Sequence, residues 1–267
     1  MARPKVIDTF MFNNELDILE CRLFELYDHL DAFVIVESER DHQDHAKPLW
    51  YADNAERFAA YADKIVHVVV KNGEMPSKAQ DADPWAREHA QREFIARGLA
   101  ALDLTDSDVI LQSDADEIPR ALHAKNVRPQ GFWSFAQRGL FWAVDYLYPH
   151  PWYGTVAATV GHLNKFPADR RFSYMRDVRM TALNPSHLTD AGWHLSWLGG
   201  ADAALRKVGS FCHPEVEDRI RNGLTSDQFL RDGIHVDGVK MRPVDVDESW
   251  PKWIVEGHAP ASWYRPR

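Results

Sequence analysis

Residues 109–117 read VILQSDADE, an apolar run that passes directly into an acidic turn. A short, continuous apolar run such as Val109–Leu111 is typical of a strand that is buried on both faces. Three similar runs come earlier in the chain: VIDTFMF at 6–12, AFVIV at 32–36 and IVHVVV at 65–70. Together the four runs predict parallel strands of one central sheet.

Helical patterns separate these runs. Leucines at positions 16, 19, 23, 26 and 30 recur at spacings of three and four, which predicts a helix with Asn13 or Asn14 as its N-cap. A second helix is expected over 55–63, and a third begins at Pro84 and continues through 85–102. Alternating strands and helices are typical of a mostly parallel sheet flanked by helices, so we expect an α/β fold.

The second half of the chain has a different composition. Residues 132–154, FWSFAQRGLFWAVDYLYPHPWYG, are crowded with aromatic side chains and indicate mixed strands that build the wall of a pocket. We expect one domain over residues 1–240, with a C-terminal tail, residues 241–267, packed on it.

The 267 residues carry 31 Lys and Arg against 40 Asp and Glu, a net charge of −9. Such a chain does not attract nucleic acid through non-specific phosphate contacts, although a metal ion or a few arginines can still bind one small phosphorylated ligand. No stretch approaches the roughly 20 apolar residues of a membrane span. Residues 1–17 lack the apolar core and cleavage site of a signal peptide. We therefore expect a cytoplasmic protein of bacterial or viral origin with reduced cysteines.

Four Asp-x-Asp triplets occur in the chain, where its 26 aspartates would give about two to three by chance. Only Asp114/Asp116 follows a buried-type strand directly, at the edge of an α/β sheet where ligands bind. In an extended segment both carboxylates face one way, and such oxygen ligands suit Mg²⁺ or Mn²⁺ bound to a diphosphate. The motifs GxxxxGK[ST] and GxGxxG are absent, which argues against P-loop and dinucleotide-binding proteins.

Further blocks extend this pattern along the chain: VIDTFMFNNELDILECRLFEL (6–26), DAFVIVES (31–38), REHAQRE (87–93), DVILQSDADEIPR (108–120), GWHLSWLGG (192–200) and KVGSF (207–211). In wording and order the blocks resemble glycosyltransferase family 17, which includes β-1,4-mannosyl-glycoprotein 4-β-N-acetylglucosaminyltransferase. The likeness runs from about residue 6 to about residue 215 and weakens in the tail.

This resemblance implies a GT-A type nucleotide-sugar transferase fold, a UDP-sugar donor such as UDP-N-acetylglucosamine, a divalent cation (Mn²⁺ or Mg²⁺) and inversion at the anomeric carbon. It assigns the cation to Asp114 and Asp116, and the nucleotide to the strand end at Glu37 and Ser38. It also points to one helix as a source of donor contacts, through Arg87, Glu88, Gln91 and Arg92.

Two features depart from the family. Relatives often have an acidic residue where this chain has Ser113. Animal members carry an N-terminal membrane anchor and stem that are not found in this sequence, so we do not expect their Golgi setting and glycoprotein acceptor to apply here.

Other residues are candidates for donor contacts. His194, in GWHLSW, is a candidate third metal ligand or diphosphate contact, and His213 is a weaker one. His42 and His45 lie in a long polar loop, which indicates a solvated surface. Candidate counter-charges for the diphosphate are Arg138, Lys165 and Lys207.

Inverting transfer also needs a general base, usually a carboxylate, to take the proton of the acceptor hydroxyl. Glu117, beside the acidic pair, and Asp145, in the aromatic segment, are the two candidates. Aromatic rings on which an acceptor sugar could stack, or which could equally be core, are Trp142, Tyr146, Trp152 and Tyr153.

The sequence thus predicts an inverting, metal-dependent glycosyltransferase that moves a sugar from a UDP-sugar to a glycan or other hydroxyl acceptor. Three alternatives remain: a transferase that glycosylates a modified DNA base, a nucleotidylyltransferase, and a non-enzymatic sugar-binding module. The net charge disfavours the first, the lack of a basic glycine-rich loop near the N-terminus disfavours the second, and the acidic turn disfavours the third.

Overall fold

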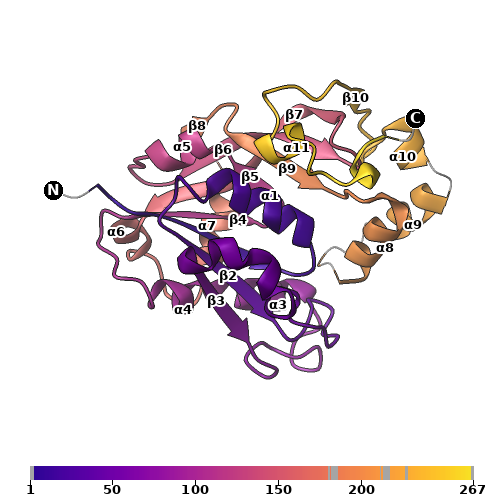
Figure 1. The fold of residues 1–267 in the computed structure, drawn as a ribbon. Helices are drawn as coiled ribbons and strands as arrows, with labels where there is room; N and C mark the ends of the chain where they lie inside the picture. The colour runs from indigo at the N-terminus through magenta and orange to yellow at the C-terminus, as the bar shows by residue number, and fades with distance from the viewer. Residues whose placement is uncertain are drawn as a thin grey trace.

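Four parallel strands form the first half of one sheet (Figure 1). They are β1 (Val6–Phe12), β2 (Ala32–Ser38), β3 (Ile65–Val70) and β4 (Val109–Asp114), hydrogen-bonded in the order β3-β2-β1-β4. The computed structural model describes residues 3–179, 181, 186–210, 212, 217–225 and 228–265. Because these strands run parallel, the carboxyl ends of β1, β2 and β4 meet at one edge of the sheet.

The second half of the sheet is mixed. Its strands are β5 (Glu117–Pro119), β6 (Trp133–Phe141), β7 (Tyr146–Thr159), β8 (Ser186–Leu188), β9 (Gly192–Ser196) and β10 (Arg242–Pro243). The order continues from β4 as β7-β6-β9-β5, with β8 on β6 and β10 on β7. Strand β7 runs antiparallel to both β4 and β6, whereas β6 and β9 are parallel. The predicted α/β fold, with a mostly parallel first half and mixed later strands, is confirmed.

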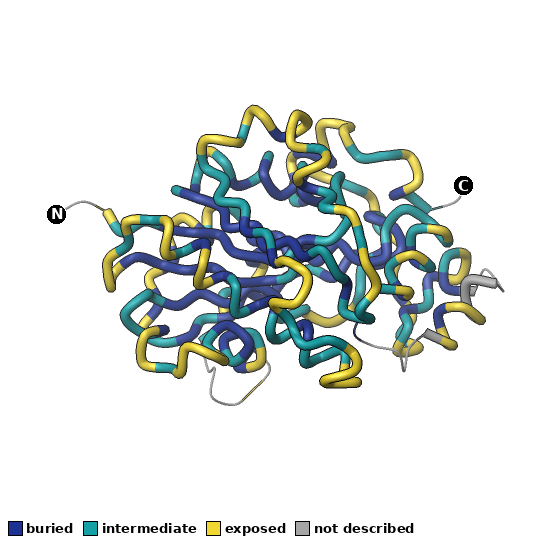
Figure 2. Tube along the Cα trace, turned by 90° about the horizontal axis from the view of Figure 1, so that it is seen from below, coloured by how far each residue is buried: buried dark blue, intermediate teal, exposed yellow. Residues whose placement is uncertain are grey.

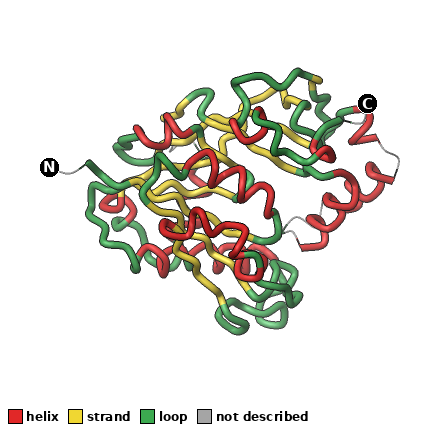
Figure 3. Tube along the Cα trace, viewed as in Figure 1, coloured by secondary structure: helices red, strands yellow, loops and turns green. Residues whose placement is uncertain are grey.

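Helices cover the sheet on both faces (Figure 3). None among the described residues is both long and apolar enough to cross a membrane. Their bounds are α1 Leu16–Leu26, α2 Trp50–Asp53, η1 Ala55–Lys64, α3 Pro84–Glu93, α4 Ile95–Leu99, α5 Ala121–Asn126, α6 Val160–Leu163, α7 Arg171–Val178, α8 Gly200–Ser210, α9 Glu217–Thr225, α10 Gln228–Asp232, α11 Lys252–Val255 and η3 Ala261–Trp263, where η marks a 3₁₀ helix.

Local details differ from the sequence prediction. Glu15, not Asn13 or Asn14, occupies the N-cap of α1, and its side chain makes no capping hydrogen bond. Residues 55–64 form a 3₁₀ helix that buries only Phe58, so this segment lacks the broad apolar stripe that supports an α-helix. Strand β4 continues past Leu111 because its pairing with β1 persists to Asp114.

Apolar side chains on the two faces of the sheet form separate core clusters. On one face, Leu19 and Leu23 of α1 and Phe58 of η1 pack on the strands. On the other face, Ile95 of α4 and Met175 of α7 do the same. The strands are accordingly buried along most of their length, and exposure is concentrated in the loops (Figure 2).

The last residues of the chain contact the second half of the sheet. Strand β10 pairs with β7. Trp250, Trp253 and Trp263 share one buried cluster with Ile18 of α1 and Ile118 of β5. These contacts place residues 242–263 against the sheet and α1.

Candidate active site

A buried arginine fixes the acidic turn from inside the fold. Arg22 of α1 donates through Nε and Nη2 to the two carboxylate oxygens of Asp8, each at 2.7 Å, and neither side chain is exposed. Its Nη1 donates to the carbonyl oxygens of residues 114, 115 and 117 at 3.0 to 3.1 Å. Nη2 also donates to Ser113 Oγ at 2.6 Å, so Ser113 takes part in the same anchor.

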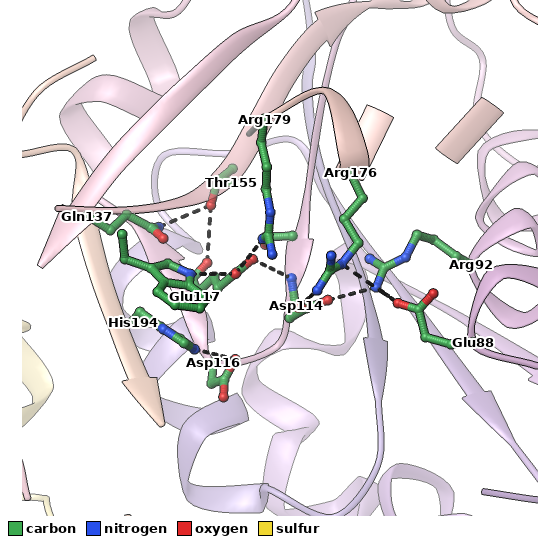
Figure 4. A network of polar contacts seen from close by, with 12 residues as sticks. Glu88, Arg92, Asp114, Asp116, Glu117, Gln137, Thr155, Arg176, Arg179 and His194 are labelled. Atoms are coloured by element: carbon green, nitrogen blue, oxygen red, sulfur yellow. Dashed lines mark hydrogen bonds and ion pairs between the residues drawn. The ribbon is translucent and has the colours of Figure 1, made fainter. Parts of the chain in front are cut away.

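Glu117 secures the turn from the other side (Figure 4). Its Oε2 accepts the Asp114 backbone N–H at 2.9 Å, and its Oε1 accepts from Trp152 Nε1 at 2.8 Å and Arg179 Nη1 at 2.7 Å. The carboxylate is fully buried and does not line the cavity described below. The structure therefore contradicts the prediction of Glu117 as general base: it has no access to an acceptor hydroxyl.

Asp114, the last residue of β4, lies between two arginines (Figure 4). Its Oδ1 accepts from Arg92 Nη2 at 2.8 Å and its Oδ2 from Arg176 Nη2 at 3.1 Å, while Glu88 pairs with both arginines from behind. Burial alone would raise the pKa of the Asp114 carboxyl, but Arg176 and Arg92 outweigh it and hold that pKa well below its usual value. Asp114 was predicted to be a metal ligand, but in this structure its carboxylate accepts hydrogen bonds from two guanidinium groups.

Asp116 points to a different set of partners. Its Oδ2 lies 2.7 Å from Lys207 Nζ, and its Oδ1 lies 3.4 Å from His194 Nε2. Burial would raise the pKa of this carboxyl, yet Lys207 and then His194 bring it well below the ordinary aspartate value. Among the described residues no group of three His, Cys, Asp or Glu side chains is arranged to hold a metal ion, so the predicted trio of Asp114, Asp116 and His194 is not assembled.

Both aspartates face a cavity of about 480 Å³ at the carboxyl edge of the parallel strands. Its wall includes Phe12 at the end of β1, Asp41 after β2 and the turn after β4. Among the described lining residues, six are Lys or Arg and five are Asp or Glu, a balance opposite in sign to that of the whole chain. The basic ones are Arg40, Lys47, Arg92, Arg176, Arg179 and Lys207.

Aromatic rings and imidazoles form another part of the wall. The Trp152 indole stacks on the His194 ring, with centroids 4.3 Å apart. Phe141 contacts His194 edge-on at 5.0 Å and His235 at 4.3 Å. The cavity therefore has a charged section around the acidic turn and a section lined by aromatic rings beside it. Such a cavity suits a ligand that carries both a charged group and a ring.

Comparison with known proteins agrees with the blocks quoted from the sequence. The family model for glycosyltransferase family 17 matches residues 1–230. The chain belongs to glycosyltransferase family 17. Its curated relatives include β-1,4-mannosyl-glycoprotein 4-β-N-acetylglucosaminyltransferase from Rattus norvegicus and from Homo sapiens, each 32% identical over 119 residues. The matched part is 43% of this chain but only 22% of either relative.

One solved structure with a similar arrangement is a mannosyltransferase from Pyrobaculum calidifontis, PcManGT, in complex with GDP-Man and Mn²⁺. It is 16% identical, with a TM-score of 0.42, and the alignment covers 86% of this chain and 71% of that one.

In this family 17 chain, several predicted donor residues lie in the cavity wall. Arg92 and Lys207 hold the two aspartates, and Gln91 lines the cavity beside His42, whose Nε2 is 3.0 Å from Gln91 Oε1. His42 was expected on a solvated surface, and this expectation is wrong: its loop folds back over α3, and burial lowers its pKa. Of the predicted acceptor aromatics, Trp152 lines the cavity.

Other predicted donor residues lie outside the cavity. Glu37 is fully buried and accepts from the Tyr51 backbone N–H at 2.9 Å, and the Ser38 hydroxyl accepts from the Arg40 backbone N–H at 3.1 Å. Arg87 donates to the carbonyls of His42 and Asp81, so it anchors the loop before α3. None of these three residues lines the cavity, and their hydrogen bonds hold the loops that follow β2 and precede α3.

The structure contradicts further predictions. Asp145 pairs with Arg265 at 2.8 Å, Arg138 pairs with Asp190 at 2.9 Å, and Lys165 is exposed, all outside the cavity wall. Trp142 and Tyr146 are buried core residues, and Tyr153 contacts His187 instead of lining the cavity. These predictions failed because charge and aromatic type do not reveal which side of a strand faces the cavity. His213 lies outside the described residues.

Sequence reasoning missed Arg176 and Arg179. Arg176 lies in the last turn of α7, and Arg179 is the residue that directly follows this helix. The first turn of α7 is capped by Glu93 of α3, whose carboxylate accepts from the Ser173 backbone N–H at 2.7 Å. This cap fixes α7 beside α3, and the spacing of three residues turns both guanidinium groups toward the turn. In the sequence, the only sign of these residues was the pair of arginines three positions apart at the end of RFSYMRDVR (171–179).

Proposed function

We propose that this family 17 chain transfers a sugar from a nucleotide diphosphate donor to a hydroxyl group of a glycan acceptor, with inversion and with the help of Mn²⁺ or Mg²⁺. One observation carries the proposal: a carboxylate pair and four buried or half-buried cations, Arg92, Arg176, Arg179 and Lys207, converge on one cavity beside an aromatic wall. The cations suit a diphosphate, and the aromatic wall suits sugar rings.

The arginines can exchange partners when a diphosphate binds. Arg176 and Arg92 are both committed to Asp114, but Nε and Nη1 of Arg92 and Nε of Arg176 are buried and have no hydrogen-bond partner among the described residues. Phosphate oxygens would satisfy donors of this kind with short, charge-assisted hydrogen bonds. Charge that develops on the leaving diphosphate would then meet positioned cations, which lowers the barrier to sugar transfer.

The donor set at Asp116 fits a hydrated divalent cation. Mg²⁺ and Mn²⁺ are commonly bound by one or two protein side chains, with water and phosphate oxygens completing the shell. Asp116 supplies carboxylate oxygens and His194 lies beside them, while Lys207 Nζ shows that a cation can reach Oδ2. When bound, the cation would neutralise part of the diphosphate charge.

UDP-N-acetylglucosamine is the first donor to test, because both curated relatives are named as N-acetylglucosaminyltransferases that act on a β-1,4-mannosyl-glycoprotein. For the same reason a β-mannoside is the first acceptor to test. The proposed acceptor class is therefore a glycan that ends in β-mannose.

A thermal-shift panel of UDP-, GDP-, CDP- and dTDP-sugars, with and without Mn²⁺, tests the proposal. We expect one nucleotide sugar to stabilise the protein in a Mn²⁺-dependent way, and Asp116→Ala to abolish both this shift and transfer. Asp245→Ala is the matched control, because Asp245 belongs to another Asp-x-Asp triplet but is exposed. Unchanged turnover in Asp116→Ala would remove the metal proposal, and sugar binding that ignores nucleotide and chelator would favour a binding module.

A further inference from the structure

The cavity wall holds a histidine that the sequence analysis did not single out. Residues 234–240 form a tight hairpin closed by the Ile234–Lys240 bridge and by the hydrogen bond from His235 N–H to the Val239 carbonyl at 2.8 Å. Trp142 Nε1 donates to the Ile234 carbonyl at 3.1 Å and so ties the hairpin to the end of β6. This arrangement places His235 in the cavity wall, against Phe141.

An acidic residue orients the His235 ring. Its Nδ1 lies 2.9 Å from Asp237 Oδ1, and Asp237 Oδ2 accepts from the Tyr148 hydroxyl at 2.6 Å. Oδ1 also accepts the Val239 backbone N–H at 2.9 Å. The Asp237 backbone N–H also lies 3.5 Å from Nδ1, but the Asp237 carboxylate oxygen is nearer. Burial would raise the pKa of this carboxyl, but its hydrogen bonds hold that pKa below the usual value, so the carboxylate is ionised and can only accept from the imidazole. The ring proton therefore resides on Nδ1. The Nε2 atom then carries the free lone pair, and it has no partner among the described residues.

We propose that His235 is the general base of the transfer reaction and that Asp237 is its positioning residue. This inference rests on the proposed function. In the step, the acceptor hydroxyl gives its proton to His235 Nε2 while its oxygen bonds to the anomeric carbon. The bond from that carbon to the diphosphate breaks, and the nucleoside diphosphate leaves with the bonding electron pair. The imidazolium afterwards releases its proton to water.

The location of His235 suits this role better than that of either predicted base. Glu117 and Asp145 lie outside the cavity wall, whereas His235 lies within it, separated from His194 and the acidic turn by the Phe141 ring. In this arrangement the diphosphate of the donor would lie beside Asp116, and the acceptor would lie beside the aromatic wall. His235 would then be on the acceptor side of the cavity.

Burial, more than the surrounding charges, favours the neutral form of His235. Burial lowers its pKa from the ordinary histidine value, as do His194 of β9 and Arg219 of α9, and Asp237 opposes them only in part. Tyr148 of β7, whose pKa is raised to about 12, stays protonated as a donor to Asp237. The base is therefore unprotonated at neutral pH, as acceptance of a proton requires.

The test compares the wild type with His235→Gln, Asp237→Asn, Asp116→Ala and a control, His258→Gln. The His258 side chain is 49% exposed and does not line the cavity. UDP-N-acetylglucosamine with Mn²⁺ is the donor, and p-nitrophenyl β-mannoside is the acceptor. We expect His235→Gln to bind the donor within about twofold of wild type but to lose about 100-fold or more in kcat. Asp237→Asn keeps an acceptor for Nδ1–H and should move the acid limb of the acceptor kcat/KM profile to lower pH.

A thiol analogue of the acceptor separates chemistry from folding. Because a thiol ionises several pH units below an alcohol, it needs little help from a base, and His235→Gln should recover most of the wild-type rate with it. The assignment is overturned if His235→Gln retains kcat within about threefold, if the thiol acceptor restores nothing, or if donor binding is lost. A wild type that neither binds nor transfers any nucleotide sugar overturns the proposed function itself, whereas an active wild type with an active His235→Gln variant overturns only the base.

Discussion

Substitution of Arg22 by methionine is expected to have a large effect on stability, although Arg22 lies outside the cavity wall. Arg22 and Asp8 are both fully buried, and Arg22 makes six hydrogen bonds, two to Asp8 and four to residues 113–117. Methionine preserves much of the side-chain volume but leaves the Asp8 carboxylate without a counter-charge. Removing one partner of a buried ion pair typically costs about 3–5 kcal/mol.

For a protein of this size, that loss corresponds to a fall in Tm on the order of 10 °C. Urea unfolding at pH 7 measures the free energy directly, with Arg3→Met as the matched control. The Arg3–Asp31 pair has similar geometry, at 2.8 Å, but the Arg3 side chain is 56% exposed. Its loss should therefore change the free energy of unfolding by less than about 1 kcal/mol.

The double variant Asp8→Leu/Arg22→Met removes both charges and should recover part of the loss, because no unpaired ion remains. It should not recover all of it, since the carbonyl oxygens of residues 114, 115 and 117 still lose their shared donor. If Arg22→Met unfolds within about 1 kcal/mol of wild type, the interpretation of Arg22 as the anchor of the turn is wrong.

The folded state lowers the pKa of Asp114, Asp116 and Glu88. The stability that these carboxylates contribute is therefore complete above about pH 5 and is lost as the pH falls below about 4. Urea unfolding at pH 7, 5 and 3.5 should show this loss, and the free energy of unfolding should fall less steeply with pH in Asp114→Asn. Gly192→Ala should lower the free energy of unfolding by at least about 2 kcal/mol, because Gly192 has φ +153° and an added Cβ would lie 2.2 Å from the Ile118 carbonyl oxygen. The control is Gly209→Ala in α8, where an added Cβ meets no atom within 4 Å. This control should be neutral or stabilising in the same urea assay. The Lys207→Met variant should bind Mn²⁺ more tightly in calorimetry without donor, because Lys207 competes with the metal ion for Asp116 Oδ2. The affinity of this variant for the donor should fall about tenfold. A weaker Mn²⁺ affinity would count against Asp116 as the cation ligand.

The sequence predicts those parts of the fold that depend on local pattern. The continuous apolar runs before residue 114 placed four parallel strands correctly, and the turn that follows β4 lies at the sheet edge where the strand pattern puts it. Glu117 was misassigned because adjacency in sequence does not reveal direction: with Trp152 and Arg179 as its partners, this side chain turns into the fold, not into the cavity.

Residues brought to the turn from far along the chain were harder to predict. Arg176 lies 62 positions after Asp114, and it arrives there because Glu93 caps the helix that carries it and Met175 of that helix packs in the core. His235 depends on a hairpin whose position is set by a hydrogen bond from Trp142. Such placements result from docking between elements, and periodicity within one segment carries no information about them.

The distribution of buried charge favours an enzyme over a passive sugar-binding module. Burying Arg92, Glu88 and much of Arg176 around Asp114 removes these ions from water, and such clusters are often no more stabilising than apolar side chains of the same volume. Arg22 and Glu117 already hold the turn, so this second charged layer is not needed for its shape. A layer of cations that faces an open cavity gains its favourable interactions when an anionic ligand enters, and it gains most when charge develops on that ligand during reaction.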